Sequence, residues 1–291
     1  MKESIFTTHH KVITMDSCND MMRIIPIGDV HKDSPNHDGD KWKSFIKGCK
    51  PTNKQNLYLG MGDFQDFMAY GERKRIKSTK LHESTVTRFD RMALSDVTET
   101  LDDLWFTKGQ WIGLIQGNHT WEFDTGPASG MSSTEYMAKR LKTKWLGDLA
   151  YIRLTFKFKN RNTRCSIDIV AAHGKAGGKL AGTTINQVDD LREIFPVADI
   201  YIMGHDHKRG AWPNSTIVMN SGKNGLVMHQ KRQWLCRSGS FLRGFVEDQP
   251  SYLVRMLKKP AELGAIELHV RFKRSCAGAN DIISPDIHAY V

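Results

Sequence analysis

The sequence predicts an α/β fold, because apolar runs of strand length alternate along the chain with segments of helical periodicity. A second observation is that ionisable or amide side chains stand directly after most of the predicted strands. The chain has 291 residues, of which 40% are hydrophobic, so it is long enough to bury a sizeable core. We therefore expect one domain over 21–274, preceded by an extension over 1–20 and followed by a polar tail over 275–291.

The individual elements follow from apolar periodicity and from cap and turn residues. The expected strands are 23–27, 57–60, 111–116, a hairpin of 152–158 and 165–172, 200–203, several shorter strands over 215–246, and 266–272. Helices are expected over 41–50, 85–106, 132–141 and 184–195. The second helix depends on apolar residues at helical spacing, and the third on Ser132 and Glu135, which stand three apart as in a capping box.

Composition excludes several classes of protein. No segment has the apolar run of a signal peptide or a membrane span, and the five cysteines never occur in C-x-x-C spacing. We therefore expect a cytoplasmic protein, acting in the host cytoplasm if it is phage-encoded, with no membrane partner.

The net charge of +10 is concentrated in the second half of the chain. Residues 151–291 carry 21 Lys/Arg against 12 Asp/Glu, whereas residues 1–150 carry 21 against 20. A basic excess attracts polyanions, so nucleic acid is a candidate substrate. The alternative is an ordinary solvated surface.

Five short motifs place metal-binding residue types just after predicted strand ends. They are Gly28-Asp29-Val30-His31, Gly62-Asp63, Gly117-Asn118-His119, His173-Gly174 and Gly204-His205-Asp206-His207. Ligands of α/β sheets bind in the crevice outside the carboxyl ends of the strands, so all five motifs should meet there. Imidazole nitrogen suits divalent transition metals, and carboxylate and amide oxygens can bridge two ions.

The spacing within the motifs is consistent with chelation. Asp29 and His31 lie two residues apart, as do His205 and His207, and an extended segment directs such pairs to one side. A glycine before the ligand lets the backbone turn sharply and approach closely. Asp63 stands alone after its strand and is well placed to bridge two ions.

The order of these motifs, from Gly28 to His207, resembles that of the calcineurin-like metallophosphoesterase superfamily, in particular its phosphodiesterase and repair-nuclease branch. The resemblance implies a four-layer sandwich of two mixed β-sheets flanked by helices, with a dinuclear metal site at the C-terminal ends of the strands. It also implies the ligand assignment. One metal would take Asp29, His31 and His207, the other would take Asn118, His173 and His205, and Asp63 would bridge them.

The resemblance further implies a chemistry. Two divalent ions, manganese before iron, zinc or nickel, would generate a hydroxide from bound water for in-line attack on phosphorus. His119 would protonate the leaving oxygen or stabilise the transition state, and Asp66 would orient His119. Phe67 follows Asp66 where the protein-phosphatase branch has an arginine, so a phosphoprotein substrate is less favoured. Thr120 replaces the acidic residue that commonly follows the Gly-Asn-His motif, which we interpret as a difference between branches and not as lost activity.

Substrate contacts are expected from basic residues outside the metal motifs. The candidates are Arg73, Arg75, Lys175, Arg237 and Arg243. The last two are interleaved with Trp234 and Phe241, a mixture suited to phosphate contact and base stacking. Three functions stay open at this point: a nuclease or other phosphodiesterase acting on nucleic acid, a hydrolase of small phosphoesters or phosphoproteins, and a non-catalytic scaffold that kept the fold.

Overall fold

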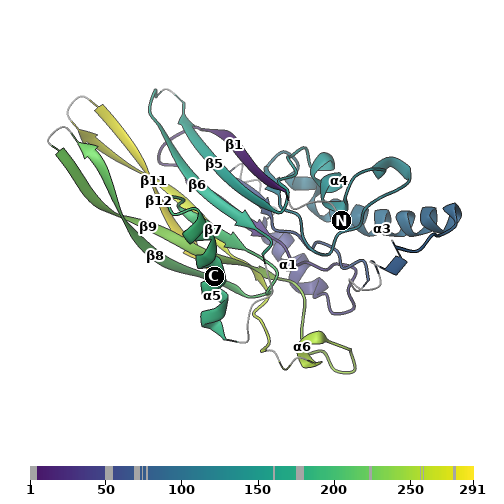
Figure 1. Cartoon of the computed structure of the whole chain (residues 1–291). Coiled ribbons are helices and arrows are strands. Elements are labelled where there is room, and N and C mark those ends of the chain that lie inside the picture. The colour runs from purple at the N-terminus through teal and green to yellow at the C-terminus, as the bar shows by residue number, and fades with distance from the viewer. Residues whose placement is uncertain are drawn as a thin grey trace.

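The computed structural model describes residues 5–49, 55–68, 73, 75, 76, 78–159, 161–174, 180–222, 225–255, 257, 259–277 and 280–291. Its centre is a pair of mixed β-sheets (Figure 1). The larger, seven-stranded sheet contains β1 (Phe6–Met15), β5 (Leu149–Phe158), β6 (Arg164–Ala172), β7 (Ile200–Met203), β9 (Gly225–Ser240) and β10 (Gly264–Ala265) in this order, with β8 (Arg209–Gly222) paired to β9. The five-stranded sheet has the order β12 (Asn280–Tyr290), β11 (Glu267–Ala277), β2 (Met22–Ile27), β3 (Asn56–Gly60) and β4 (Trp111–Leu114).

The helices cover the outer faces of the two sheets. The helices α1 (Gly39–Cys49), α3 (Glu83–Leu104) and α4 (Ser133–Arg140) pack on the smaller sheet, and α5 (Ala181–Ile194) packs on the larger one. The chain also forms a short α6 (Tyr252–Arg255) and the 3-10 turns η1 (Trp105–Thr107) and η2 (Gly126–Ala128). The predicted fold class is therefore confirmed, with two mixed sheets and flanking helices in four layers.

The main core lies between the sheets, because each sheet turns alternate apolar side chains towards the other. In β5, Ile152, Leu154 and Phe156 are fully buried, whereas the residues between them are partly or fully exposed. Burying one such side chain is worth roughly 1.5–3 kcal/mol. The capping box that was expected from Ser132 and Glu135 begins α4 with both of its hydrogen bonds present.

The ends of the described chain differ from the expected extension and tail. Residues 6–15 form β1, which pairs in parallel with β5 along its whole length. Residues 280–290 form β12, which pairs with β11 and buries Ile283 in the core between the sheets. Both segments mix apolar with polar residues irregularly, so they have neither the strict alternation of a half-buried strand nor the continuous apolar run of a buried central strand.

The region expected to hold several shorter strands is instead one long hairpin. β8 and β9 pair in unbroken antiparallel register from Arg209 opposite Ser238 to Gly222 opposite Gly225. Polar residues interrupt its apolar positions because much of the hairpin is exposed on both faces.

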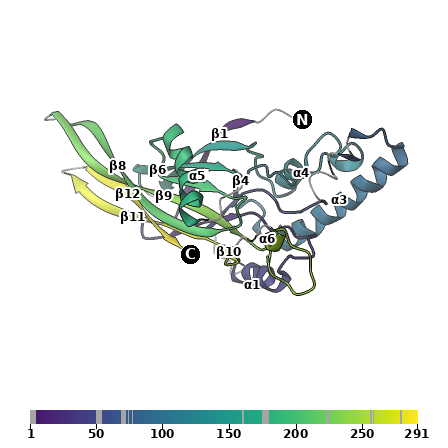
Figure 2. The same ribbon diagram turned by 60° about the horizontal axis from the view of Figure 1, so that its bottom comes forward.

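The sheets extend beyond the helical part of the molecule. The hairpins β5–β6, β8–β9 and β11–β12 point away from α1, α3 and α4, as the two views in Figures 1 and 2 show. The loops that carry the five sequence motifs lie at the opposite ends of the strands, next to the helices. No helix in the described part of the chain is both long and apolar enough to cross a bilayer.

Candidate metal centre

The loops that follow β2, β3, β4, β6 and β7 carry all the predicted ligands. The structure brings these residues together in two sets, each with its ligand atoms within 4.8 Å of one another: Asp29, His31 and His207, and Asp63, His173 and His205. The first set contains the three residues that the resemblance implies for one metal, and the second contains His173 and His205 of the other metal together with Asp63. Asn118 joins the second set, since its Oδ1 lies 2.8 Å from Nε2 of His173.

The two carboxylates that connect the sets are each fixed by one oxygen. The backbone N–H of His205 donates to Asp29 Oδ2 at 2.9 Å, and that of His119 donates to Asp63 Oδ1 at 2.7 Å. The other oxygens face imidazoles, with Asp63 Oδ2 at 3.0 Å from His173 Nε2 and Asp29 Oδ1 at 3.5 Å from His207 Nε2. Each carboxylate therefore keeps one oxygen for an ion.

The chemistry of the donors fits divalent metals. Asp29 Oδ1 and both ring nitrogens of His31 are buried and have no hydrogen-bond partner among the described residues. Such atoms are costly to bury unless something else satisfies them. Burial raises the pKa of Asp29, which means that its carboxylate lacks a sufficient counter-charge. A cation held by these three residues would remove both deficits.

In the second set, the carboxylate of Asp63 has a counter-charge within the set itself. Burial opposes the ionised forms of Asp63 and His173, but their mutual attraction outweighs it, so the pKa of Asp63 falls and that of His173 rises to about 9. Without an ion, a proton on His173 therefore acts as the counter-charge of the Asp63 carboxylate.

The local backbone is unusual at the ligands themselves. Asp29, His31, Asp63, His205 and His207 have φ between 47° and 68°. This left-handed region is uncommon for residues other than glycine, and it is concentrated at functional sites. The spacing of Asp29 and His31 predicts an extended segment. In the structure the two side chains do lie together, but their backbone is left-handed and not extended.

The glycines of the motifs mainly permit close approach. A Cβ on Gly117 would lie 2.1 Å from Asp63 Oδ1, and one on Gly204 would lie 2.9 Å from Asp29 Oδ2. Gly62 is different, because its own φ is 88°. Gly117 and Gly204 thus leave the space that the two carboxylates occupy, whereas a Cβ on Gly62 would meet the backbone of Gly117.

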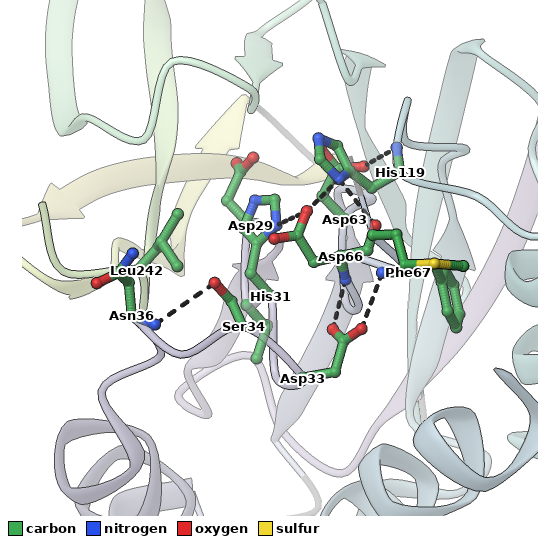
Figure 3. A network of polar contacts seen from close by, with 12 residues as sticks. Asp29, His31, Asp33, Ser34, Asn36, Asp63, Asp66, Phe67, His119 and Leu242 are labelled. Carbon is green, nitrogen blue, oxygen red and sulfur yellow. Dashed lines mark hydrogen bonds and ion pairs between the residues drawn. The ribbon is translucent and has the colours of Figure 1, made fainter. Parts of the chain in front are cut away.

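A histidine–aspartate pair lies beside the ligands (Figure 3). Nδ1 of His119 is 2.5 Å from Asp66 Oδ1, and the same oxygen is 3.6 Å from Nδ1 of His31. Burial alone would raise the pKa of Asp66, but the two imidazoles hold it well below its ordinary value. Asp66 is therefore an ionised acceptor that fixes the ring of His119 and leaves Nε2 of that ring for a reactant.

Asp33 is a further residue of this cluster, and sequence reasoning missed it. Its carboxylate accepts from the backbone N–H groups of Asp66 at 2.5 Å and Phe67 at 2.8 Å (Figure 3). The signal was available, because Asp33 follows His31 by two residues within the first motif loop. It fixes the loop that presents Asp66 to His119.

Two expected substrate contacts have other partners in the structure. The guanidinium of Arg237 is fully buried and donates to the carbonyl oxygens of Gly204 and Thr184 and to the side chain of Gln187. It also lies 3.6 Å from the carboxylate of Asp206. Arg237 therefore holds the loop of His205 and His207 against α5, which corrects the expectation that it contacts substrate.

Arg73 is also buried, at 5% exposure. It donates to the carbonyl oxygens of Asp66, Met68 and Asn118, and its guanidinium lies 3.3 Å from Nδ1 of His119. It connects the loops that present Asp66 and His119, so its donors are used within the protein and not by a substrate.

The other basic candidates differ in position. Arg243 is half-exposed, and its Nε lies 3.7 Å from Asp38. Its neighbour Phe241 donates its backbone N–H to the carbonyl of Asp29, so Arg243 is close to the centre in sequence and space. Arg75 is exposed on the segment that follows Arg73. Lys175 lies outside the described residues.

The fold and these residues define a class, namely a two-sheet α/β protein with two neighbouring histidine–carboxylate sets in the loops after its strands. Neither the family models nor the curated proteins compared with the sequence give a match. Among solved structures, the chain is similar to a 5'-nucleotidase precursor of Thermus thermophilus, with 14% identity and a TM-score of 0.38 over 93% of this chain and 54% of that chain. It is also similar to a calcineurin-like phosphoesterase of Bacillus subtilis, with 10% identity and a TM-score of 0.27 over 92% and 90% of the two chains. The chain thus spans about half the length of the Thermus thermophilus protein. Both likenesses are distant, so function follows from the residues of the site.

Proposed function

We propose that this chain is a metal-dependent phosphoesterase of the calcineurin-like superfamily, and that its substrates are phosphodiesters of nucleic acid. The observation that supports this most is the convergence of two buried donor sets and a histidine–aspartate pair on one crevice. A scaffold without catalysis would have no need of buried acceptors that lack a partner, such as Asp29 Oδ1.

In this proposal the ligands divide between two divalent ions. Asp29, His31 and His207 would hold one ion, Asn118, His173 and His205 would hold the other, and Asp63 would lie between them. Bound ions would neutralise phosphoryl oxygens and supply a nucleophile from water at neutral pH. Imidazole, carboxylate and amide donors together suit manganese, iron, zinc or nickel, and we propose manganese as the cofactor.

The protein's own residues would handle the leaving group. Asp66 holds His119 by Nδ1, so a proton on Nε2 is the one that His119 can give to a leaving oxygen. Arg73 and Asp33 keep the two loops at a fixed separation. General acid catalysis of this kind contributes about 10²- to 10⁴-fold.

The choice of nucleic acid depends on charge. Residues 207–246 contain seven Lys/Arg and no Asp/Glu, and this segment passes beside Asp29 through Phe241. An excess of cations attracts a phosphate backbone, although Arg237 is buried and Lys231 is paired with Asp199. Arg243 is the described residue that is best placed for such a contact.

The test is a substrate screen with manganese-loaded protein. Single-stranded and duplex DNA and RNA, bis-p-nitrophenyl phosphate and p-nitrophenyl phosphate would be compared at equal protein concentration. We expect cleavage of a polynucleotide and faster turnover of the diester than of the monoester. Asp63→Asn should lose at least about 100-fold in activity and metal affinity, because substituting even the hydrogen-bond partners of metal ligands costs about 10- to 100-fold. Asp102→Asn, at an exposed position of α3, is the matched control.

The other results would select the alternatives. Turnover of the monoester without cleavage of any polynucleotide would favour small phosphoesters or phosphoproteins as substrates. A protein that binds no metal and cleaves nothing would be the scaffold.

A further inference from the structure

The larger sheet lacks part of one strand. In its centre, Ile200 of β7 lies between Ile169 of β6 and Trp234 of β9, and both pairings are parallel. β7 starts at Ile200, but its neighbours continue away from the metal centre, β6 through 164–168 and β9 through 225–233. No β7 residue stands between these two extensions.

A cleft occupies this position. Its volume is about 1030 Å³, which is at the upper end of the usual range for ligand sites, roughly 300–1,000 Å³. β6 and β9 form its walls, Asp199 lies at the end where β7 begins, and residues 284–287 of β12 border it from the other sheet. Figure 1 shows the hairpins β5–β6 and β8–β9 extending separately from the larger sheet, with β11–β12 alongside. The cleft is separate from the metal centre, because none of the predicted metal ligands lines it.

The two walls have unused backbone edges. Within the described residues, 164–167 pair with β5 on one side only, and 225–233 pair with β8 on one side only, whereas the backbone of Asp168 is already bonded to Asp199. Alternate N–H and C=O groups of each wall therefore point into the cleft. An edge of this kind is a template for another strand, and proteins usually protect such edges with charge, proline or a covering element.

The side chains around the cleft favour a ligand with one apolar and one acidic face. On the inner side, Ile167 is buried, and Trp234 packs on the core and donates its indole N–H to the carbonyl of Ile287. On the outer side the aspartates are already matched with cations, Asp168 with Arg153 and Asp199 with Lys231.

Basic side chains that have no acidic partner determine the net charge at the rim of the cleft. Within the described part of the chain, no carboxylate lies within ion-pair distance of Arg232 or of Arg164, which ends the β6 wall. His229 adds a further imidazole at the open end of the β9 wall. The cleft therefore attracts negative charge at its outer rim.

We propose that this cleft binds an extended, acidic peptide segment of a partner protein, which adds as a strand between β6 and β9. The segment would continue the line of β7 and bond to both walls through its main chain, as in other cases of strand addition. Its alternate side chains would face the apolar floor near Trp234 and the basic rim near Arg232.

A nucleic acid fits the cleft less well. Single strands are held by several aromatic side chains on which successive bases stack, whereas this cleft has one tryptophan, and its N–H is already bonded. Two facing rows of unpaired N–H and C=O groups match a peptide, whose main chain has both donors and acceptors, whereas phosphate oxygens can only accept hydrogen bonds.

The test uses the full chain and the peptide acetyl-Val-Glu-Val-Glu-Val-Glu-Val-amide. We expect saturable binding in fluorescence anisotropy with a labelled peptide, together with slower amide exchange confined to 164–167 and 225–233. The same peptide, N-methylated at alternate amides, keeps its side chains and loses its donors on one edge. It should bind about tenfold more weakly or worse, because each lost hydrogen bond costs roughly 0.5–1.5 kcal/mol.

Two protein variants complete the test. Arg232→Glu should weaken binding of the peptide about tenfold, whereas Arg88→Glu, an equal charge change at an exposed position of α3 away from the cleft, should not. Binding should persist in Asp63→Asn, which separates this proposal from the one for the metal centre. Equal binding of the N-methylated peptide, absence of exchange protection on the walls, or displacement of the peptide by oligo-dT would each overturn it.

Discussion

At the scale of single residues, the candidate centre combines groups that are unfavourable on their own. Asp29 and Asp63 are buried carboxylates, and both have left-handed backbone. Each such backbone conformation costs about 1–2 kcal/mol for a residue with a side chain. The surrounding sheets can maintain it because the loops are short and each carboxylate is tied to a backbone N–H of another loop. The stability of the rest of the fold therefore holds Asp29 and Asp63 in backbone conformations that are unfavourable for them.

His173 leads to a prediction about pH. Its pKa is raised to about 9 by Asp63 in the metal-free protein, despite burial, but it must be neutral to bind a metal. Metal binding at pH 7 should therefore release about one proton from this residue, and apparent affinity should rise by up to about tenfold per pH unit until pH 9.

Calorimetric titration with manganese in buffers of different ionisation enthalpy measures this release. His173→Gln, which has no imidazole to deprotonate, should release fewer protons in the same titration. An observed enthalpy that does not depend on the buffer at pH 7 would contradict the proposed protonation of His173.

The positions of the ligands could be predicted from the sequence, but their surroundings could not. Five motifs in a fixed order predict that these candidate ligands lie together, since each motif must stand at a strand end. Nothing in the sequence distinguishes Arg237, which is buried, from Arg243, which is half-exposed. That difference depends on contacts with α5, which is distant in the chain.

At the scale of elements, α3 supports the loop that follows the Gly-Asn-His motif. Asp90 of α3 is buried, and its carboxylate accepts from the indole of Trp121, the backbone N–H groups of Asp124 and Thr125, and the hydroxyl of Thr125. One carboxylate thus organises a turn close to His119. The sequence predicts the helix from its apolar face but gives no sign of this polar contact.

Replacing this carboxylate should weaken the whole fold. Asp90→Asn keeps the shape, but its amide can accept fewer of the four hydrogen bonds, and each bond to a charged group is worth about 1.5–3 kcal/mol. We expect the free energy of unfolding to fall by about 3 kcal/mol in urea titrations.

Asp102→Asn on the same helix is exposed and should change stability by less than about 0.5 kcal/mol. If the two variants were equally stable, Asp90 would not organise the turn.

The alternation of strands and helices could also be predicted at this scale, whereas the length of β8 and β9 could not. Sequence periodicity reports burial, and β9 changes from exposed residues near Gly225 to buried residues near Ser240. A hairpin that is buried at one end and exposed at the other therefore has the sequence pattern of several short strands. Backbone hydrogen bonds fix the pairing of β8 with β9, and an apolar face does not.

At the scale of the whole molecule, the two sheets depend on segments that the sequence assigns to an extension and a tail. β1 and β12 are edge strands, and each adds a strand to a different sheet. Such strands are difficult to predict because their apolar and polar residues do not alternate regularly, and the partner of β1 is also remote in sequence.

Substitutions in β12 test whether this last strand is part of the stable fold. Ile283 is 4% exposed in the core between the sheets, and its neighbour Ile282 is 45% exposed on the other face of β12. If residues 280–290 are a structural strand, Ile283→Ala should lower the free energy of unfolding by about 2–5 kcal/mol, whereas Ile282→Ala should change it by no more than about 0.5 kcal/mol. The pair differs in burial alone, so equal and small effects in denaturant titrations would mean that the segment is a tail. A large effect confined to Ile283 would mean that the sandwich needs β12, and that the wall of the cleft formed by residues 284–287 is part of the stable fold.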